Sequence, residues 1–122
     1  MSNLQIPSKL ERYKQVYPSG LNDLNNAYYG AKNINKAYLA EVGKNVKGFS
    51  KIERVSTEDY TWFWGMYFKF SNSDLAFLFP WCQDNSMANG TSLDRSIAVH
   101  VKGELDRKNL ESTIYSLMKL LT

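Results

Sequence analysis

The chain has 122 residues and a formal net charge of +3, with 43% hydrophobic and 22% charged residues. This length suits one domain that buries its own core, and the composition argues against wholesale disorder or a coiled coil. No apolar run approaches the roughly 20 residues that cross a bilayer. We therefore expect a single domain over residues 1–122 and no membrane span.

The positive charge is concentrated in the first part of the chain. Residues 1–51 hold eight lysines and arginines against three acidic residues, a net +5, so the remainder carries −2. This asymmetry suits an acidic partner, and nucleic acid is a less favoured alternative.

The expected compartment follows from the N-terminus and from cysteine usage. The first residues lack the basic and apolar regions of a secretory signal. The single cysteine, Cys82, rules out an intramolecular disulfide framework and fits a reducing compartment. We therefore expect a cytoplasmic protein, and the Lys- and Asn-rich composition suggests an AT-rich genome, as in a bacterium or a mobile element.

The first half of the chain carries helical patterns. Ser8 and Glu11 have the spacing of a capping box, which predicts a short helix that ends near a Pro-Ser-Gly turn. Apolar residues three or four apart then predict a longer second helix, from Leu21 to a point between Gly43 and Gly48.

An aromatic hairpin follows the helices. Tyr60–Phe70 is dense in aromatic residues that favour strands, Ser71–Asp74 supplies turn residues, and Leu75–Trp81 resumes the apolar run. Alternating apolar residues predict a further strand over 97–102. A weaker pattern at Ile52–Val55 is a candidate fourth strand.

The last element is a C-terminal helix, for which Asp106 is the expected N-cap. Together these elements predict an α+β fold with an antiparallel sheet of three to four strands. The sheet would contain the aromatic hairpin 60–81 and the strand 97–102, packed with two N-terminal helices and one C-terminal helix.

The period of two along a strand assigns the hairpin side chains to two faces. Trp64, Met66 and Phe68 share one face of the first hairpin strand, and Phe63 and Tyr67 share the other. Both faces carry apolar bulk. Either helices cover both sides of the sheet, or one side is available to a partner.

The sequence shows no pattern of catalytic or metal-binding residues. His100 is the only histidine, and nothing near Cys82 in the sequence would activate its thiol. The glycines are scattered, so no phosphate-binding loop is formed. We therefore expect a non-enzymatic protein with no metal and no cofactor, and an enzyme that uses His100 is a third hypothesis.

Two sets of residues are candidates for binding. Packing in the core is the favoured explanation of the aromatic block, but three tryptophans and six phenylalanines are many for a small sheet, and the surplus suggests a surface or a pocket. Tyr29, Lys32 and Lys36 fall on one face of the second predicted helix and could contact phosphates or acidic side chains, although ordinary solvated lysines are the favoured interpretation. The expected partner-binding or ligand-binding residues are Trp62, Trp64, Tyr67, Phe77, Trp81, Tyr29, Lys32 and Lys36.

These observations favour a small non-enzymatic intracellular binding protein that acts through protein–protein interaction, as an inhibitor or immunity-like protein. Its partner would be another protein, with an acidic surface as one option, and a homodimer is a further option. The alternative is a small-molecule-binding domain whose aromatic pocket lies around Trp62, Trp64, Phe77 and Trp81. The polar stretch 82–96 is the longest expected loop and a candidate functional segment.

Overall fold

The computed structural model describes residues 10–31, 34–56, 62–80 and 96–121, and at Trp62 it describes the backbone alone. The elements are β1 (Lys14–Val16), α1 (Leu21–Gly30), α2 (Lys36–Lys44), β2 (Phe49–Ser56), β3 (Trp62–Lys69), β4 (Ser73–Pro80), β5 (Ala98–Gly103) and α3 (Arg107–Leu121). Within these ranges five strands form one antiparallel sheet in the order β1-β5-β4-β3-β2. The predicted α+β fold is confirmed, with one strand more than expected.

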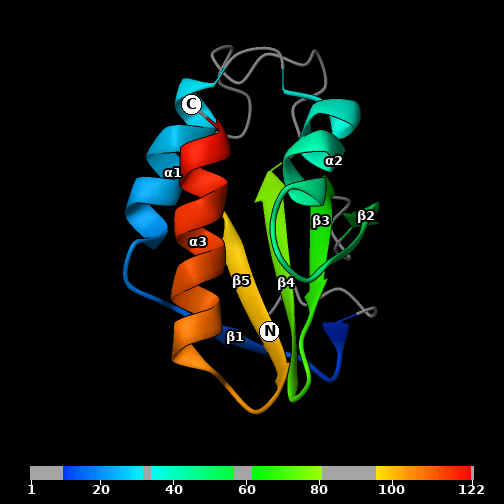
Figure 1. Ribbon diagram of the computed structural model, residues 1–122. Coiled ribbons are helices and arrows are strands. Elements are labelled where there is room, and N and C mark those ends of the chain that lie inside the picture. The colour runs from blue at the N-terminus through cyan, green and yellow to red at the C-terminus, as the bar shows by residue number, and fades with distance from the viewer. Residues whose placement is uncertain (1–9, 32–33, 57–61, 81–95, 122) are drawn as a thin grey trace, which may run out of the picture.

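All three described helices lie on one face of the sheet (Figure 1). Large side chains that alternate along β3 and β4 form the floor of this core. The rings of Phe68 and Phe77 pack edge to face with their centroids 5.6 Å apart, and Phe77 and Phe79 are fully buried. This geometry is favourable for aromatic pairs, and it places the main core between the sheet and the helices.

Tyr28 fixes α1 to the sheet. Its ring lies 5.1 Å from that of Phe79, centroid to centroid, and its hydroxyl donates a hydrogen bond to the backbone carbonyl of Pro80. One turn earlier, the side chain of Asn25 accepts a hydrogen bond of 2.8 Å from the amide of Ile97. These two contacts hold α1 against the end of β4 and the start of β5.

The segment before α1 is not the short helix predicted from the capping-box spacing. The amide of Tyr13 donates to the carbonyl of Leu10 at 2.9 Å in a turn, and β1 then pairs with β5. An isolated helix of about ten residues is marginal in water. Val16, opposite Val99, instead packs against the core and extends the hydrogen-bond ladder of the sheet. The start of the predicted helix lies outside the described residues.

The long second helix predicted from apolar spacing is divided into α1 and α2. Gly30, a weak helix former, ends α1, and Ala31 after it has an extended backbone. The side chain of Asn35 then accepts a hydrogen bond of 2.9 Å from the amide of Tyr38 and caps a new helix. The break was missed because the apolar spacing continues across it.

The remaining elements agree with the sequence patterns. β3 and β4 form the expected hairpin, in which Lys69 lies opposite Asp74. β5 confirms the strand predicted over 97–102, and β2 confirms and lengthens the candidate strand. The carboxylate of Asp106 accepts a hydrogen bond of 3.2 Å from the amide of Asn109, as expected for the N-cap of α3.

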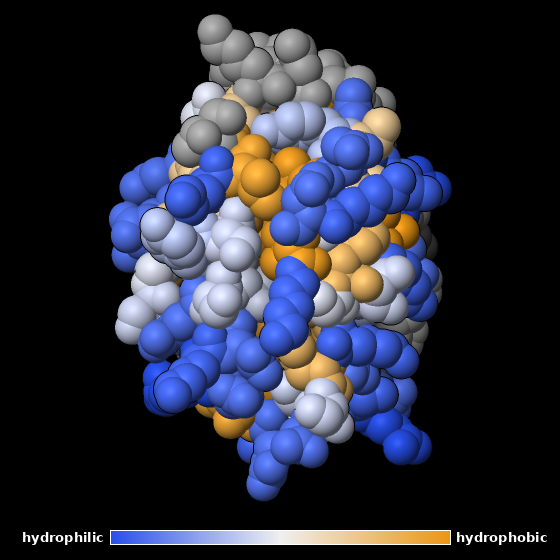
Figure 2. Space-filling view, in the orientation of Figure 1, coloured by the Kyte–Doolittle hydropathy of each residue, from blue (hydrophilic) through white to orange (hydrophobic). Residues whose placement is uncertain are grey.

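The helix-covered side presents a largely hydrophilic surface with a band of hydrophobic side chains between α2 and α3 (Figure 2). Among the helices of the described ranges, none is both long enough and apolar enough to cross a membrane.

Replacing Tyr28 by phenylalanine tests how α1 is fixed. The variant keeps the ring contact with Phe79 but removes the hydrogen bond to the Pro80 carbonyl, so we expect the free energy of unfolding in urea to fall by about 1–2 kcal/mol. Tyr115→Phe is the control because Tyr115 is 58% exposed, and it should change the free energy by less than about 0.5 kcal/mol. Equal effects of the two changes would contradict this assignment.

Candidate functional site

The sheet face opposite the three helices, called here the helix-free face, carries a second and smaller apolar cluster. Its buried members are Leu10, Val55, Phe63, Tyr67, Ala76 and Leu78. Leu10 and the partly buried Tyr13 reach this face from the turn that precedes β1. Near the turn between β3 and β4 this face carries charged side chains instead of apolar ones. Side chains alternate between the two faces along each strand, and this places Lys69 and Asp74 on the same face as the cluster.

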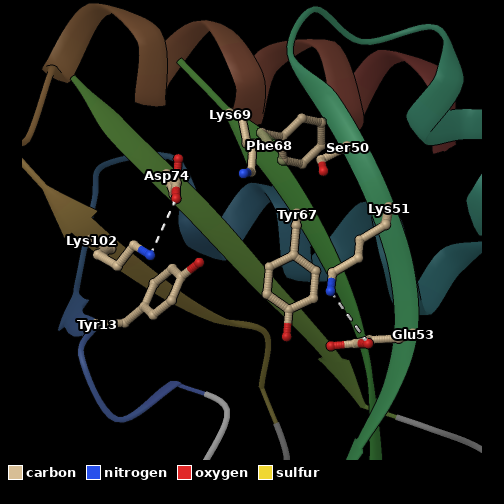
Figure 3. A pocket seen from close by; sticks show the side chains of 9 residues that line it. All are labelled: Tyr13, Ser50, Lys51, Glu53, Tyr67, Phe68, Lys69, Asp74 and Lys102. Carbon is tan, nitrogen blue, oxygen red and sulfur yellow. Dashed lines mark ion pairs between the residues drawn. The ribbon is translucent and has the colours of Figure 1, made fainter. Parts of the chain in front are cut away.

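A pocket of about 420 Å³ lies on this charged part of the helix-free face (Figure 3). Its walls come from the turn before β1 and from strands β2 to β5. The lining residues are Tyr13, Ser50, Lys51, Glu53, Tyr67, Phe68, Lys69, Asp74 and Lys102. Three lysines and two carboxylates give this lining a net charge of +1. We call it the Tyr67 pocket.

On the β2 side of the pocket a lysine stands over an aromatic ring. The ammonium of Lys51 lies 3.6 Å from a carboxylate oxygen of Glu53 and 5.2 Å from the ring centroid of Tyr67. The Lys51 side chain is 59% exposed, so the ion pair contributes about 1 kcal/mol at most. The carboxylate nevertheless compensates the charge of this lysine.

The β5 side repeats the arrangement with different residues. The ammonium of Lys102 lies 3.6 Å from a carboxylate oxygen of Asp74 and 5.6 Å from the ring centroid of Tyr13. Lys69 lies between the two sides, opposite Asp74 in the β3–β4 register, and is exposed. Asp74 forms its ion pair with Lys102, and Lys69 has no ion-pair partner within the described part of the chain. The excess positive charge of the pocket therefore resides on Lys69.

Small neighbours allow the Tyr67 ring to lie flat in the sheet face. A Cβ atom at Gly65 would come within 2.9 Å of Val55 Cγ2 and 3.2 Å of Tyr67 Cε1, so both side chains use the space that the glycine leaves. Ala76 lies directly opposite Tyr67 in the register of β3 and β4. This packing leaves Tyr67 only 7% exposed.

The Tyr67 hydroxyl is buried and lies beside the Glu53 carboxylate (Figure 3). Burial raises the pKa of the phenol, and the neighbouring Glu53 carboxylate raises it further. The hydroxyl is therefore protonated at neutral pH and is able to donate a hydrogen bond. Buried polar groups are usually paired, and the Glu53 carboxylate is the group placed to accept a hydrogen bond from this hydroxyl.

His100 lies on the same face, one strand beyond Ala76 from Tyr67. It is 4% exposed, and its Nδ1 atom has no hydrogen-bond partner within the described ranges. Burial lowers the pKa of this imidazole, because removal from water disfavours the charged form. His100 is therefore neutral at pH 7.

The structure distributes the predicted site residues over several places. Tyr67 lies in the pocket, whereas Phe77 is fully buried beneath the helices and Trp64 packs, partly buried, against the same core. Tyr29 belongs to α1 and Lys36 begins α2, so the single helix face predicted for them is not formed. The side chain of Trp62, residues Trp81 and Lys32, and segment 82–95 of the predicted loop lie outside the described residues.

None of the five charged residues of the pocket was predicted as a site residue. Alternation alone places Lys69 on the face of Tyr67, and Lys102 on the face of His100, which is the signal that could have found them. The sequence does not show that Tyr13 and Lys51 join them, because this depends on the order of the strands in the sheet. Mild surface charges were interpreted as solvated, and no pattern distinguished these lysines from the others.

Two further sources of information on the pocket are metal-binding groups and similarity to known proteins. No group of three or more His, Cys, Asp or Glu residues in the described ranges is placed to hold a metal ion. No protein-family model, curated protein or solved structure is significantly similar to the chain. Function is therefore inferred from the helix-free face itself.

His100 should make stability depend on pH. Below the ordinary histidine pKa of about 6.5 the unfolded chain binds a proton that the folded protein does not, so stability falls as pH decreases from 6.5. We expect thermal melts between pH 7.5 and pH 5.0 to show a larger loss of stability for the wild type than for His100→Gln. Parallel losses would show that the buried imidazole is not the cause.

Proposed function

We propose that the protein is a small non-enzymatic binding protein, which acts through protein–protein interaction as an inhibitor or immunity-like protein. The observation that carries this proposal is the lysine-lined pocket on the sheet face opposite the three described helices. The described helices pack on one face, while the other face combines an apolar cluster with a lysine-lined pocket. The members of the apolar cluster are themselves buried, so the part of this face that a partner could contact is the charged rim of the pocket.

The charge of the pocket supports an acidic partner. Its net charge is +1, and the side chains of Lys51 and Lys102 are 59% and 47% exposed, so they can meet an approaching surface. Complementary charges at an interface increase the rate of association and select among partners. We place this interaction in the cytoplasm because the chain has a single cysteine.

The second candidate function is binding of a small molecule. The pocket volume of about 420 Å³ falls within the range of small-molecule sites, roughly 300–1,000 Å³. Such sites are mostly apolar and enclose their ligand, whereas five charged side chains line this one. The protein-binding function is therefore favoured. The aromatic pocket was expected around Trp62, Trp64, Phe77 and Trp81; because Phe77 is fully buried, this candidate uses the Tyr67 pocket instead.

A fluorescence titration distinguishes the two candidates. A ligand of the pocket contacts Tyr67 and Tyr13, so a small-molecule binder should show saturable changes in tyrosine emission with some member of a metabolite panel, and Lys69→Glu should reduce them. The protein-binding function predicts no saturable change with the panel. A metabolite that binds wild type and Lys69→Glu equally tightly would lie outside the pocket.

The protein-binding function is tested by quantitative capture from host extract with immobilised wild-type protein and two charge reversals. Lys69→Glu, in the pocket, should weaken capture of a specific partner at least tenfold. Lys108→Glu, on the exposed side of α3, is matched in residue type and charge change and should stay within about twofold. Circular dichroism confirms that both variants fold. Equal capture by all three proteins would show that the helix-free face is not the contact surface.

A further inference from the structure

We propose that the protein forms a symmetric dimer, in which the β2 strands of two copies pair antiparallel along their outer edges. The pairing is centred on Ile52, so that Lys51 of each copy lies opposite Glu53 of the other. This inference goes beyond the proposed function, because the partner is a second copy of the chain and the contact is a strand edge.

β2 is an edge strand whose outer backbone groups are available for pairing. It ends the strand order β1-β5-β4-β3-β2, and among the described strands it pairs with β3 alone (Figure 1). Within the described ranges, residues 51–56 make no backbone hydrogen bond outside that ladder. Every second residue of such a strand turns its amide and carbonyl outward, where another strand can bind them.

The opposite edge of the sheet offers much less backbone. β1 has three residues, whereas β2 has eight. A very short edge strand is one means by which proteins avoid edge-to-edge association, and β2 lacks this protection. Pairing between copies is therefore expected at β2.

The charges on β2 prevent most pairings of two copies but permit one. Charged side chains protect an edge strand because like charges that lie opposite each other are destabilising. Centring a symmetric pair on Lys51, Glu53 or Arg54 would bring two like charges together. Centring it on Ile52 instead places Lys51 of each copy opposite Glu53 of the other, which gives two attractive contacts by symmetry.

Registers centred nearer either end of β2 avoid like charges but are poorly formed. Centring on Val55 would pair only residues 54–56 of each copy, because β2 ends at the last of these. Centring on Phe49 or Ser50 would fall on the irregularity at that end of the strand. Charge and strand geometry therefore select the register centred on Ile52.

The side chains fit this register on both faces of the sheet. On the helix-free face the Lys51 ammonium already lies 3.6 Å from a Glu53 oxygen of its own chain, and pairing adds the carboxylate of the second copy. On the other face Ile52, which packs partly buried against the main core, meets its own copy and loses exposed apolar surface.

Pairing in this register joins the two sheets into one. The axis lies perpendicular to the sheet, so the helix-free faces of both copies are on the same side. Lys51 and Glu53 also line the Tyr67 pocket, so the two pockets lie on either side of the axis on one continuous face. A single partner with a repeated acidic surface could then contact both pockets.

Sedimentation velocity of the purified full chain tests the dimer. Few residues pair, so the interface is small and the measurement extends from about 10 µM to about 1 mM. We expect a monomer–dimer equilibrium for the wild type. Lys51→Glu and Glu53→Lys should each weaken dimerisation about tenfold or more, because each places like charges opposite one another. Lys108→Glu, on the exposed side of α3, is the matched control and should stay within about twofold.

Mixing the two variants separates pairing between copies from effects within one chain. The Lys51→Glu chain is acidic at positions 51 and 53, and the Glu53→Lys chain is basic at both. Each variant therefore repels its own copy and attracts the other. We expect an equimolar mixture to dimerise within about threefold of the wild type. Loss of folding, or loss of the ion pair inside each chain, would not be restored by mixing.

Three results would overturn the proposal. A wild-type chain that is monomeric at about 1 mM has no such dimer. Dimerisation that neither charge reversal weakens takes place on another surface. A mixture of the two variants that stays monomeric removes the register centred on Ile52.

The outcomes for this dimer and for the proposed function are distinguishable. Lys69 lies on β3, away from the proposed axis, so Lys69→Glu should weaken capture of a partner and leave dimerisation unchanged. Dimerisation without any captured protein would support the β2 contact and remove the protein-binding function. Capture by a strictly monomeric chain would do the reverse.

Discussion

The arrangement of this molecule depends on a difference in side-chain size between the two faces of the β3–β4 hairpin. One face presents Met66, Phe68, Phe77 and Phe79, all fully buried beneath the helices. Gly65 and Ala76 lie on the other face, where they leave room for the Tyr67 ring. Burying large rings stabilises the fold most, so the helices pack on the first face. The second face is left with a shallower cluster and a pocket.

Charge on the helix-free face is largely balanced locally. Lys51 with Glu53, and Lys102 with Asp74, form ion pairs beside a tyrosine ring on opposite sides of the pocket. These exposed pairs add little stability, but they hold two lysine stems over aromatic rings and so define the pocket walls. The pocket walls are therefore formed by paired side chains, and the net charge of the pocket stays small.

The sequence predicted the secondary-structure elements that have local signals. Its predictions were wrong for elements whose conformation depends on residues far away in the chain. Aromatic density and alternation identified the β3–β4 hairpin, and the Asp106 cap identified α3. β1 was mistaken for a helix because its conformation comes from pairing with β5, which no local pattern reports. The division between α1 and α2 was missed because apolar spacing continues across it, although Asn35 carries a capping signal.

The site was predicted only in part, for the same reason. Tyr67 was selected from the aromatic block, and alternation correctly assigned it to a face. The pocket, however, joins residues from the turn before β1 and from four strands, so it exists only once the strand order is known. The buried state of the Tyr67 hydroxyl, which distinguishes this tyrosine from the exposed Tyr17 and Tyr115, also depends on tertiary packing.

The pairing of the first strand with β5 has a consequence for biosynthesis. Val16 meets Val99, more than 80 residues later in the chain, and α1 packs against α3 at the end of the described structure. During translation the N-terminal segment emerges from the ribosome long before the residues that complete its ladder. Closing so long a loop is slow relative to local hairpin formation. The sheet is therefore completed only after β5 has been synthesised, with β1 among the last strands to join.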